Sequence, residues 1–141
     1  MKKVLTFLFA IIILSSCKKE ETSDGNSYPQ KWKLTRMDAG LLGNQDPLPY
    51  LEFYLLNADS TFTKSREVAN NIQTVSGTFS VNGDYITFIY KSDNDLISFC
   101  DRPKLMEKMI LKSNGELYND TGLALDCPAY LYEKIDITSK N

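Results

Sequence analysis

Three cysteines and the complete absence of histidine define the chemistry open to this chain of 141 residues. A thiol can accept a lipid or form a disulfide, whereas histidine is the usual general base and the commonest metal ligand. The sequence contains no phosphate-binding glycine loop, no nucleophile elbow and no Cys-His pair. We therefore expect a protein that is not an enzyme and that holds neither a metal nor a cofactor.

Cys17 closes an N-terminal segment with the composition of a secretion signal. Two lysines come first, and Val4–Leu14 contains a single polar residue, Thr6. A largely apolar segment of about eleven residues suits the central region of a signal peptide, whereas a membrane-spanning helix needs about 20 apolar residues. The closing Leu14-Ser15-Ser16-Cys17 resembles the lipobox of bacterial lipoproteins, in which the chain is cut before the cysteine and the thiol is lipidated. The alternative is an uncleaved N-terminal anchor.

Cleavage before Cys17 divides the chain into a signal peptide (1–16), a lipidated cysteine with a flexible tether (17–30) and one domain (31–141). The tether is polar and contains Gly25 and Pro29, so it has too little apolar surface to fold. Without the signal peptide the chain keeps 14 basic residues against 18 acidic ones, a net charge of −4. Lys18-Lys19 is the only basic run after the signal peptide, so we expect no nucleic-acid partner.

The tether opens with Cys17-Lys18-Lys19-Glu20-Glu21. This run looks like the signal that sends lipoproteins of some Gram-negative bacteria to the outer face of the outer membrane, although a solvated charge run has the same composition. We expect the membrane to be a partner through acyl chains such as palmitate. The expected location is the outer membrane, with the domain exposed at the cell surface.

Cys100 and Cys127 remain once Cys17 is assigned to the lipid, and an even number of cysteines in an oxidising compartment predicts a disulfide between them. The alternative is two buried free thiols. The bridge would bring the neighbouring Asp101 and Asp126 together, and close carboxylates can share a proton or hold Ca²⁺. No dense carboxylate loop accompanies them, so we interpret them as turn residues.

Alternation with a period of two recurs along the domain and predicts short strands. It is cleanest at Thr74–Val81, where Gly77 is predicted to mark a bend or bulge. The predicted strands are Lys31–Met37, Leu51–Leu56, Thr61–Glu67, Thr74–Val81, Tyr85–Tyr90, Leu96–Cys100, Leu105–Ser113, Glu116–Asn119, Leu123–Cys127 and Ala129–Ile137. Thr61–Glu67 is the most polar, which suits either an edge strand or a strand facing a wet interior.

No segment has a helical period over ten residues or more, so we predict an all-β domain. Eight to ten short strands joined by turns such as Asn82-Gly83-Asp84 favour an antiparallel up-and-down β-barrel, because closure removes exposed strand edges. A two-sheet β-sandwich is the alternative.

The domain resembles the small lipocalin-like lipoproteins of Gram-negative bacteria over about Lys31 to Ile137. The motifs that carry this resemblance are Trp32-Lys33-Leu34, Asn57-Ala58-Asp59-Ser60-Thr61-Phe62, Gly77-Thr78-Phe79 with Asn82-Gly83-Asp84, and Tyr130-Leu131-Tyr132-Glu133-Lys134. Gln30 stands where the ligand-carrying lipocalins have glycine. The resemblance therefore implies a barrel more firmly than it implies a ligand pocket.

Several residues are candidates for binding or modification. Trp32 could form the floor of a ligand cavity, although a lone tryptophan on a first strand is more often a plug for the barrel end. Tyrosines including Tyr54, Tyr90 and Tyr132 could line a pocket or stack on sugars, but tyrosine is also a common strand residue. Asp59-Ser60-Thr61 resembles a bacterial O-glycosylation acceptor, with Ser60 as the modified residue.

Two functions fit these observations. The first is a non-catalytic binding module that captures a small apolar ligand or a glycan at the cell envelope. The alternative is a protein-interaction or inhibitor module that acts through its loops, above all Asp38–Pro49, which is long for a compact β domain. A filled barrel interior would favour the alternative.

Overall fold

The computed structural model describes residues 27–38, 43–98, 105–120 and 127–137. All regular secondary structure in these residues is β, as predicted, and no helix among them could span a membrane. The eight strands are β1 (Gln30–Asp38), β2 (Leu51–Leu56), β3 (Thr61–Val68), β4 (Asn71–Asn82), β5 (Tyr85–Tyr90), β6 (Met106–Leu111), β7 (Glu116–Asn119) and β8 (Ala129–Ile135).

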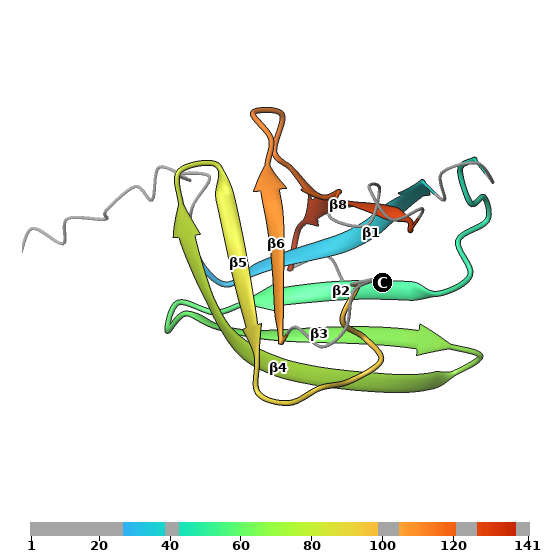
Figure 1. The fold of residues 1–141 in the computed structure, drawn as a ribbon, viewed down its shortest axis with the longest axis horizontal. Coiled ribbons are helices and arrows are strands. Elements are labelled where there is room, and N and C mark those ends of the chain that lie inside the picture. The colour runs from blue at the N-terminus through green and yellow to red at the C-terminus, as the bar shows by residue number, and fades with distance from the viewer. Residues whose placement is uncertain (1–26, 39–42, 99–104, 121–126, 138–141) are drawn as a thin grey trace, which may run out of the picture.

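The strands form a closed antiparallel barrel in which each strand pairs with the next and β8 pairs with β1 (Figure 1). The predicted up-and-down barrel is confirmed, and the alternative of a two-sheet sandwich is excluded. Thr61–Glu67 is not an edge strand, because β3 pairs with β2 on one side and with β4 on the other.

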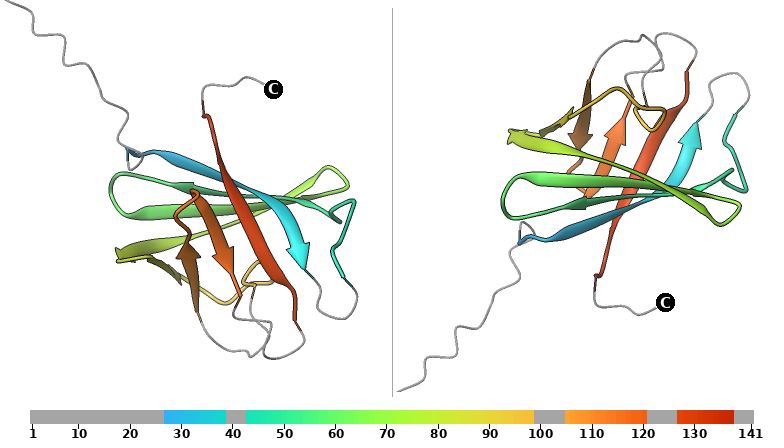
Figure 2. Two further views of the ribbon diagram at one scale, coloured as in Figure 1. Left: turned by 90° about the horizontal axis from the view of Figure 1, so that it is seen from above. Right: turned by 90° about the horizontal axis from the view of Figure 1, so that it is seen from below.

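The two ends of the barrel differ in their connections, as Figure 2 shows from above and below. At the end where β1 begins, here called the Trp32 end, tight turns join β2 to β3, β4 to β5 and β6 to β7. Gly83 and Gly115 take positive φ values of 59° and 81° in two of these turns, a conformation that favours glycine. The longer connections β1–β2, β5–β6 and β7–β8 gather at the opposite end, here called the Glu52 end.

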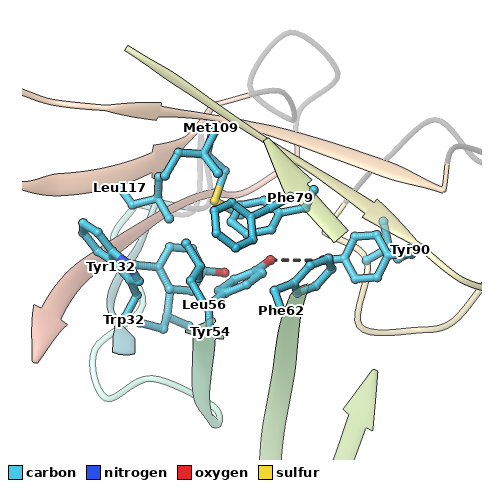
Figure 3. Packing of buried hydrophobic residues seen from close by; sticks show 13 residues of the cluster. Trp32, Tyr54, Leu56, Phe62, Phe79, Tyr90, Met109, Leu117 and Tyr132 are labelled. Atoms are coloured by element: carbon cyan, nitrogen blue, oxygen red, sulfur yellow. Dashed lines mark hydrogen bonds between the residues drawn. The ribbon is translucent and has the colours of Figure 1, made fainter. Parts of the chain in front are cut away.

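Apolar side chains fill the interior toward the Trp32 end (Figure 3). Rings from different strands contact one another there: the ring centroids of Phe62 and Phe88 lie 4.9 Å apart, and those of Tyr54 and Phe88 lie 4.8 Å apart. Burial of such large side chains is the main favourable contribution to folding. Over the whole interior, the buried apolar and aromatic side chains in contact with one another are Trp32, Leu34, Tyr54, Leu56, Phe62, Phe79, Ile86, Phe88, Tyr90, Ile97, Met109, Leu117 and Tyr132.

Gly77 permits a close approach of two strands and does not mark a bulge. The pairing of β3 with β4 runs past it without a register shift. A Cβ atom at this position would lie 1.9 Å from the backbone oxygen of Ile89 and 2.8 Å from the Phe62 ring. Only a residue without a side chain fits there.

The predicted strand Leu96–Cys100 is also wrong over Leu96–Ser98, the part that the structure describes. Asn94 folds this segment into a turn, because its side-chain oxygen accepts a hydrogen bond from the Leu96 amide and its backbone oxygen accepts one from Ile97. Such local bonds compete with strand pairing. Of the predicted strand Leu123–Cys127, residues 123–126 lie outside the described residues.

Candidate functional site

Charged and tyrosine side chains occupy the interior toward the Glu52 end. Alternate residues of a strand point to the same face, and this places the inward positions of β2, β3, β5, β6 and β8 around one space. We define the polar cluster as Glu52, Tyr54, Lys64, Arg66, Tyr90, Ser98, Glu107 and Tyr132. Glu52, Lys64 and Glu107 are each 0% exposed, which is rare for ionisable residues.

Glu107 of β6 accepts hydrogen bonds from four donors. The hydroxyls of Tyr54 and Tyr90 donate to Oε2, and the Ser98 amide donates to Oε1. Lys64 Nζ lies 3.2 Å from the same Oε1. Both oxygens are thus occupied by donors of this chain, which offsets the cost of burying a carboxylate.

Both carboxylate oxygens of Glu52, on β2, also have donors of this chain beside them, as those of Glu107 do. Tyr132 donates to Oε1 at 2.6 Å, and Lys64 Nζ lies 3.4 Å from that oxygen. Arg66 stands directly opposite Glu52 on the neighbouring strand, and its Nε and Nη2 atoms both lie 2.6 Å from Oε2 of Glu52.

Lys64 links the two carboxylates. Its Nζ also donates to the Ser98 hydroxyl at 3.0 Å and lies 4.9 Å from the centroid of the Tyr54 ring. With Arg66, the cluster holds two basic and two acidic side chains, so its formal charges cancel. Removing one partner of such a buried set would leave a charge without compensation.

The three tyrosines of the cluster remain protonated far into the alkaline range. Burial, reinforced by the Glu107 carboxylate, raises the pKa of Tyr54 and of Tyr90 well above 10. Burial and the Glu52 carboxylate do the same for the pKa of Tyr132. The phenol groups therefore serve as hydrogen-bond donors to carboxylates and not as bases.

The connection between β5 and β6 closes the cluster from the Glu52 end. Leu96, Ile97 and Ser98 are buried, and Ser98 reaches Glu107 through its amide and Lys64 through its hydroxyl. The backbone oxygen of Asp95 lies 3.5 Å from the Nη1 atom of Arg66. This segment fills the space next to the carboxylate with its own backbone and side chains.

Arg66 and two tyrosines form the outermost layer at this end. The Arg66 guanidinium lies 4.2 Å from the centroid of the Tyr50 ring, and its side chain is 17% exposed. Burial raises the pKa of Tyr50 and of Tyr130, and the nearby Glu52 carboxylate acts in the same direction. The Arg66 guanidinium, packed against the half-buried Tyr50 ring, is thus the part of the cluster closest to solvent.

The structure separates the predicted site residues. Tyr54, Tyr90 and Tyr132 meet in the cluster, where the hydroxyl oxygens of Tyr54 and Tyr90 lie 3.2 Å apart (Figure 3) and both donate to Glu107. Trp32 is buried toward the opposite end, and its indole N–H has no acceptor among the described residues. Ser60 lies in the exposed β2–β3 turn with a φ of 64°.

Most of the remaining predicted residues lie outside the part of the chain that the structure describes. These are Cys17, Cys100, Asp101 and Asp126, together with the signal peptide and most of the tether. Cys127 stands shortly before β8. The lipid site and the Cys100–Cys127 bridge therefore stay predictions. No group of His, Cys, Asp and Glu suited to a metal ion occurs within the described ranges.

Sequence reasoning missed Glu52, Lys64 and Glu107. A signal was present in each strand: Glu52 shares its alternation with Tyr54 and Leu56, Lys64 shares it with Phe62, and Glu107 shares it with Met109. A charged residue in phase with residues destined for the core suggests a buried ion.

Comparisons with family models, curated proteins and solved structures find no match for this chain.

Proposed function

We propose that this chain is a non-catalytic binding module of the cell envelope, anchored in the outer membrane by a lipid on Cys17. Its binding surface would be formed by the connections at the Glu52 end and not by the interior of the barrel. This is the protein-interaction function, and the barrel would act as the rigid support of the binding loops.

The observation that carries the proposal is the internal saturation of the polar cluster. Glu107 receives donors from Tyr54, Tyr90, Ser98 and Lys64. A ligand entering there would have to displace these groups and leave buried charges without partners, which is costly. The apolar half offers side chains in mutual contact instead of polar groups that could orient a ligand.

The described connections at the Glu52 end are open to solvent. Gly43–Tyr50 is mainly exposed and is held to the barrel by an isolated bridge between Asp38 and Asn44. Lys91–Asp93 is exposed before the chain turns inward. A partner protein could contact both segments without unfolding any strand.

A small ligand is the second candidate, and the layer formed by Tyr50, Arg66 and Tyr130 favours it. A guanidinium beside half-buried rings can bind the hydroxyls and rings of a glycan. Such a ligand would rest on the Glu52 end and would not fill the barrel.

Trp32 provides the test, because it is the only tryptophan and is buried inside the barrel. Titration with a fatty acid should leave its emission unchanged, since a ligand of the outer surface does not reach the ring. A saturable change in Trp32 emission with one apolar molecule bound would overturn the proposal. Binding of an oligosaccharide that is lost in Tyr50→Ala would select the second candidate.

The anchor has an independent test. Cys17→Ser should abolish palmitate labelling and release the protein from membranes. Retention in the membrane fraction would instead favour an uncleaved N-terminal anchor, and it would not affect the assignment of the binding surface.

A further inference from the structure

One strand of the closed barrel keeps a free edge. β4 pairs with β3 from Asn71 to Thr78, but its pairing with β5 begins only at Gly77. On the side of β4 that faces β5, one further hydrogen bond runs from the Lys91 amide to the Ser76 oxygen at 3.3 Å. Asn71–Val75 thus has a strand partner on one side only among the described residues. Figure 1 shows β5 leaving β4 midway while β4 continues alongside β3, and both views of Figure 2 show the hairpin end projecting.

The direction of the backbone groups on this edge follows from two bonds. Phe79 donates to the Ser60 oxygen, so odd-numbered residues of β4 bond toward β3. Ser76 accepts from Lys91, so even-numbered residues bond toward β5. Because the direction alternates along a strand, the N–H and C=O groups of Ile72 and Thr74 point toward the free edge.

Among the residues that the structure describes, this edge lacks the features that usually prevent strand pairing. No charged residue and no proline occurs from Val68 to Gly83. The β3–β4 pairing contains no bulge, and Ile72 is 63% exposed. Natural edge strands are normally blocked by lysine, proline, bulges or covering loops.

We propose that the free edge of β4 pairs with the same edge of a second copy of this chain. An antiparallel two-fold arrangement centred on Gln73 would place Ile72 opposite Thr74 of the second copy, and Thr74 opposite the second copy's Ile72. Both positions are hydrogen-bonded pairs that exchange two backbone bonds each, so every free edge group finds a partner. The arrangement stops before Ser76, whose oxygen is already occupied.

Self-complementarity favours a second copy over a different protein. The segment carries no charge, so two copies meet without repulsion. Ile72 and Thr74 are both β-branched and share the outer face, where cross-strand pairs of such side chains are favourable. The contact is short, and we expect weak association that strengthens when chains are concentrated on a membrane. The inference does not depend on the proposed binding function.

A cysteine cross-link tests this register in intact cells. Gln73 would face its own counterpart as a non-hydrogen-bonded pair at a Cα separation of about 4.5 Å, which a disulfide can bridge. Gln73→Cys should form a covalent dimer on mild oxidation. Thr78→Cys is the matched control, because Thr78 is exposed on the same strand but paired on both sides. Equal cross-linking of both variants, or of neither, would overturn the proposal.

Sedimentation equilibrium provides the second measurement, with Cys17→Ser in every chain to keep the protein out of membranes. The association constant, measured from about 10 μM to 1 mM, should fall at least about tenfold in Thr74→Lys and should be unchanged in Thr78→Lys. A chain that stays monomeric throughout would contradict the proposal. The Ile72 and Thr74 amides could instead be protected from hydrogen exchange in cells although Gln73→Cys forms no cross-link. That result would mean that another protein pairs with the edge, and it would also overturn the proposal.

Discussion

Lys64 and Glu107 lie on strands that are not neighbours, β3 and β6, and their charged groups meet 3.2 Å apart inside the barrel. β4 and β5 separate these strands along the wall, so the contact crosses the interior. The ion pair therefore links β3 and β6, which are not joined to each other by backbone hydrogen bonds.

Lys64→Met should destabilise the fold by about 3 to 5 kcal/mol, because Glu52 and Glu107 would lose their shared cation while remaining buried. Urea unfolding followed by Trp32 fluorescence measures this loss. Lys108→Met is the control: Lys108 is exposed, and its Nζ lies 3.9 Å from the centroid of the Tyr85 ring. We expect a change of about 1 kcal/mol or less there. Equal losses in the two variants would show that the buried ion pairs contribute nothing specific.

Stability should fall above about pH 10, and Tyr90→Phe should reduce the slope. The raised pKa values of Tyr54, Tyr90 and Tyr132 mean that these phenols keep their protons when folded and lose them near pH 10 when unfolded. The contribution is therefore complete below pH 10 and is lost as the pH rises. Each tyrosine accounts for about 1.4 kcal/mol per pH unit in this range. Absorbance at 295 nm in native buffer and in urea checks the titration, and coincident curves would refute the prediction.

Gly77→Ala should cost at least about 3 kcal/mol or prevent folding, since the new Cβ would overlap the Ile89 backbone oxygen. A backbone atom held in a β-ladder cannot move aside as a flexible side chain can. Thr78→Ala, next in the same strand and exposed, should change the midpoint of thermal unfolding little. A stable Gly77→Ala protein would mean that β4 and β5 can separate locally.

Ser60→Gly should remove an O-linked glycan, if Ser60 is its acceptor, without harming the fold. Ser60 is exposed in the turn, and its φ of 64° suits glycine. The turn itself is held by Asp59, whose side chain accepts hydrogen bonds from the Thr61 amide and hydroxyl. Intact mass spectrometry of the protein from its own cells measures the glycan. Ser80→Ala, another exposed serine, is the control, and an unchanged mass in Ser60→Gly beyond the substitution itself would exclude this acceptor.

Cys127→Ser should lower the free energy of unfolding by about 3 to 4 kcal/mol if Cys100 and Cys127 form the predicted bridge, because the bridge restricts the unfolded chain. Peptide mapping under non-reducing conditions should recover a linked pair containing both cysteines. Alkylation of both residues without prior reduction would disprove the bridge.

The alternation of apolar and polar residues, together with the turn motifs, was enough to predict most strands and tight turns, and it favoured a closed sheet over a two-sheet sandwich. Asn82-Gly83 and Asn114-Gly115 specify their turns locally, and eight short strands in a meander avoid exposed edges most simply by closing. Leu96–Ser98 was misassigned because a single side chain, Asn94, redirects the backbone. The close contact at Gly77 was not predicted because it depends on Ile89, a residue of another strand.

The sequence by itself determined that each strand has two unlike faces, since a period of two is a local property of the backbone. Only the tertiary structure decided which face is inside and which inward residues meet. Glu52, Lys64 and Glu107 are ordinary surface residues by type, and they are buried because barrel closure brings β6 across the interior from the neighbouring strands β2 and β3, where Arg66 completes the balance of charges. The free edge of β4 has the same origin, because the unequal lengths of paired strands appear only when register is fixed.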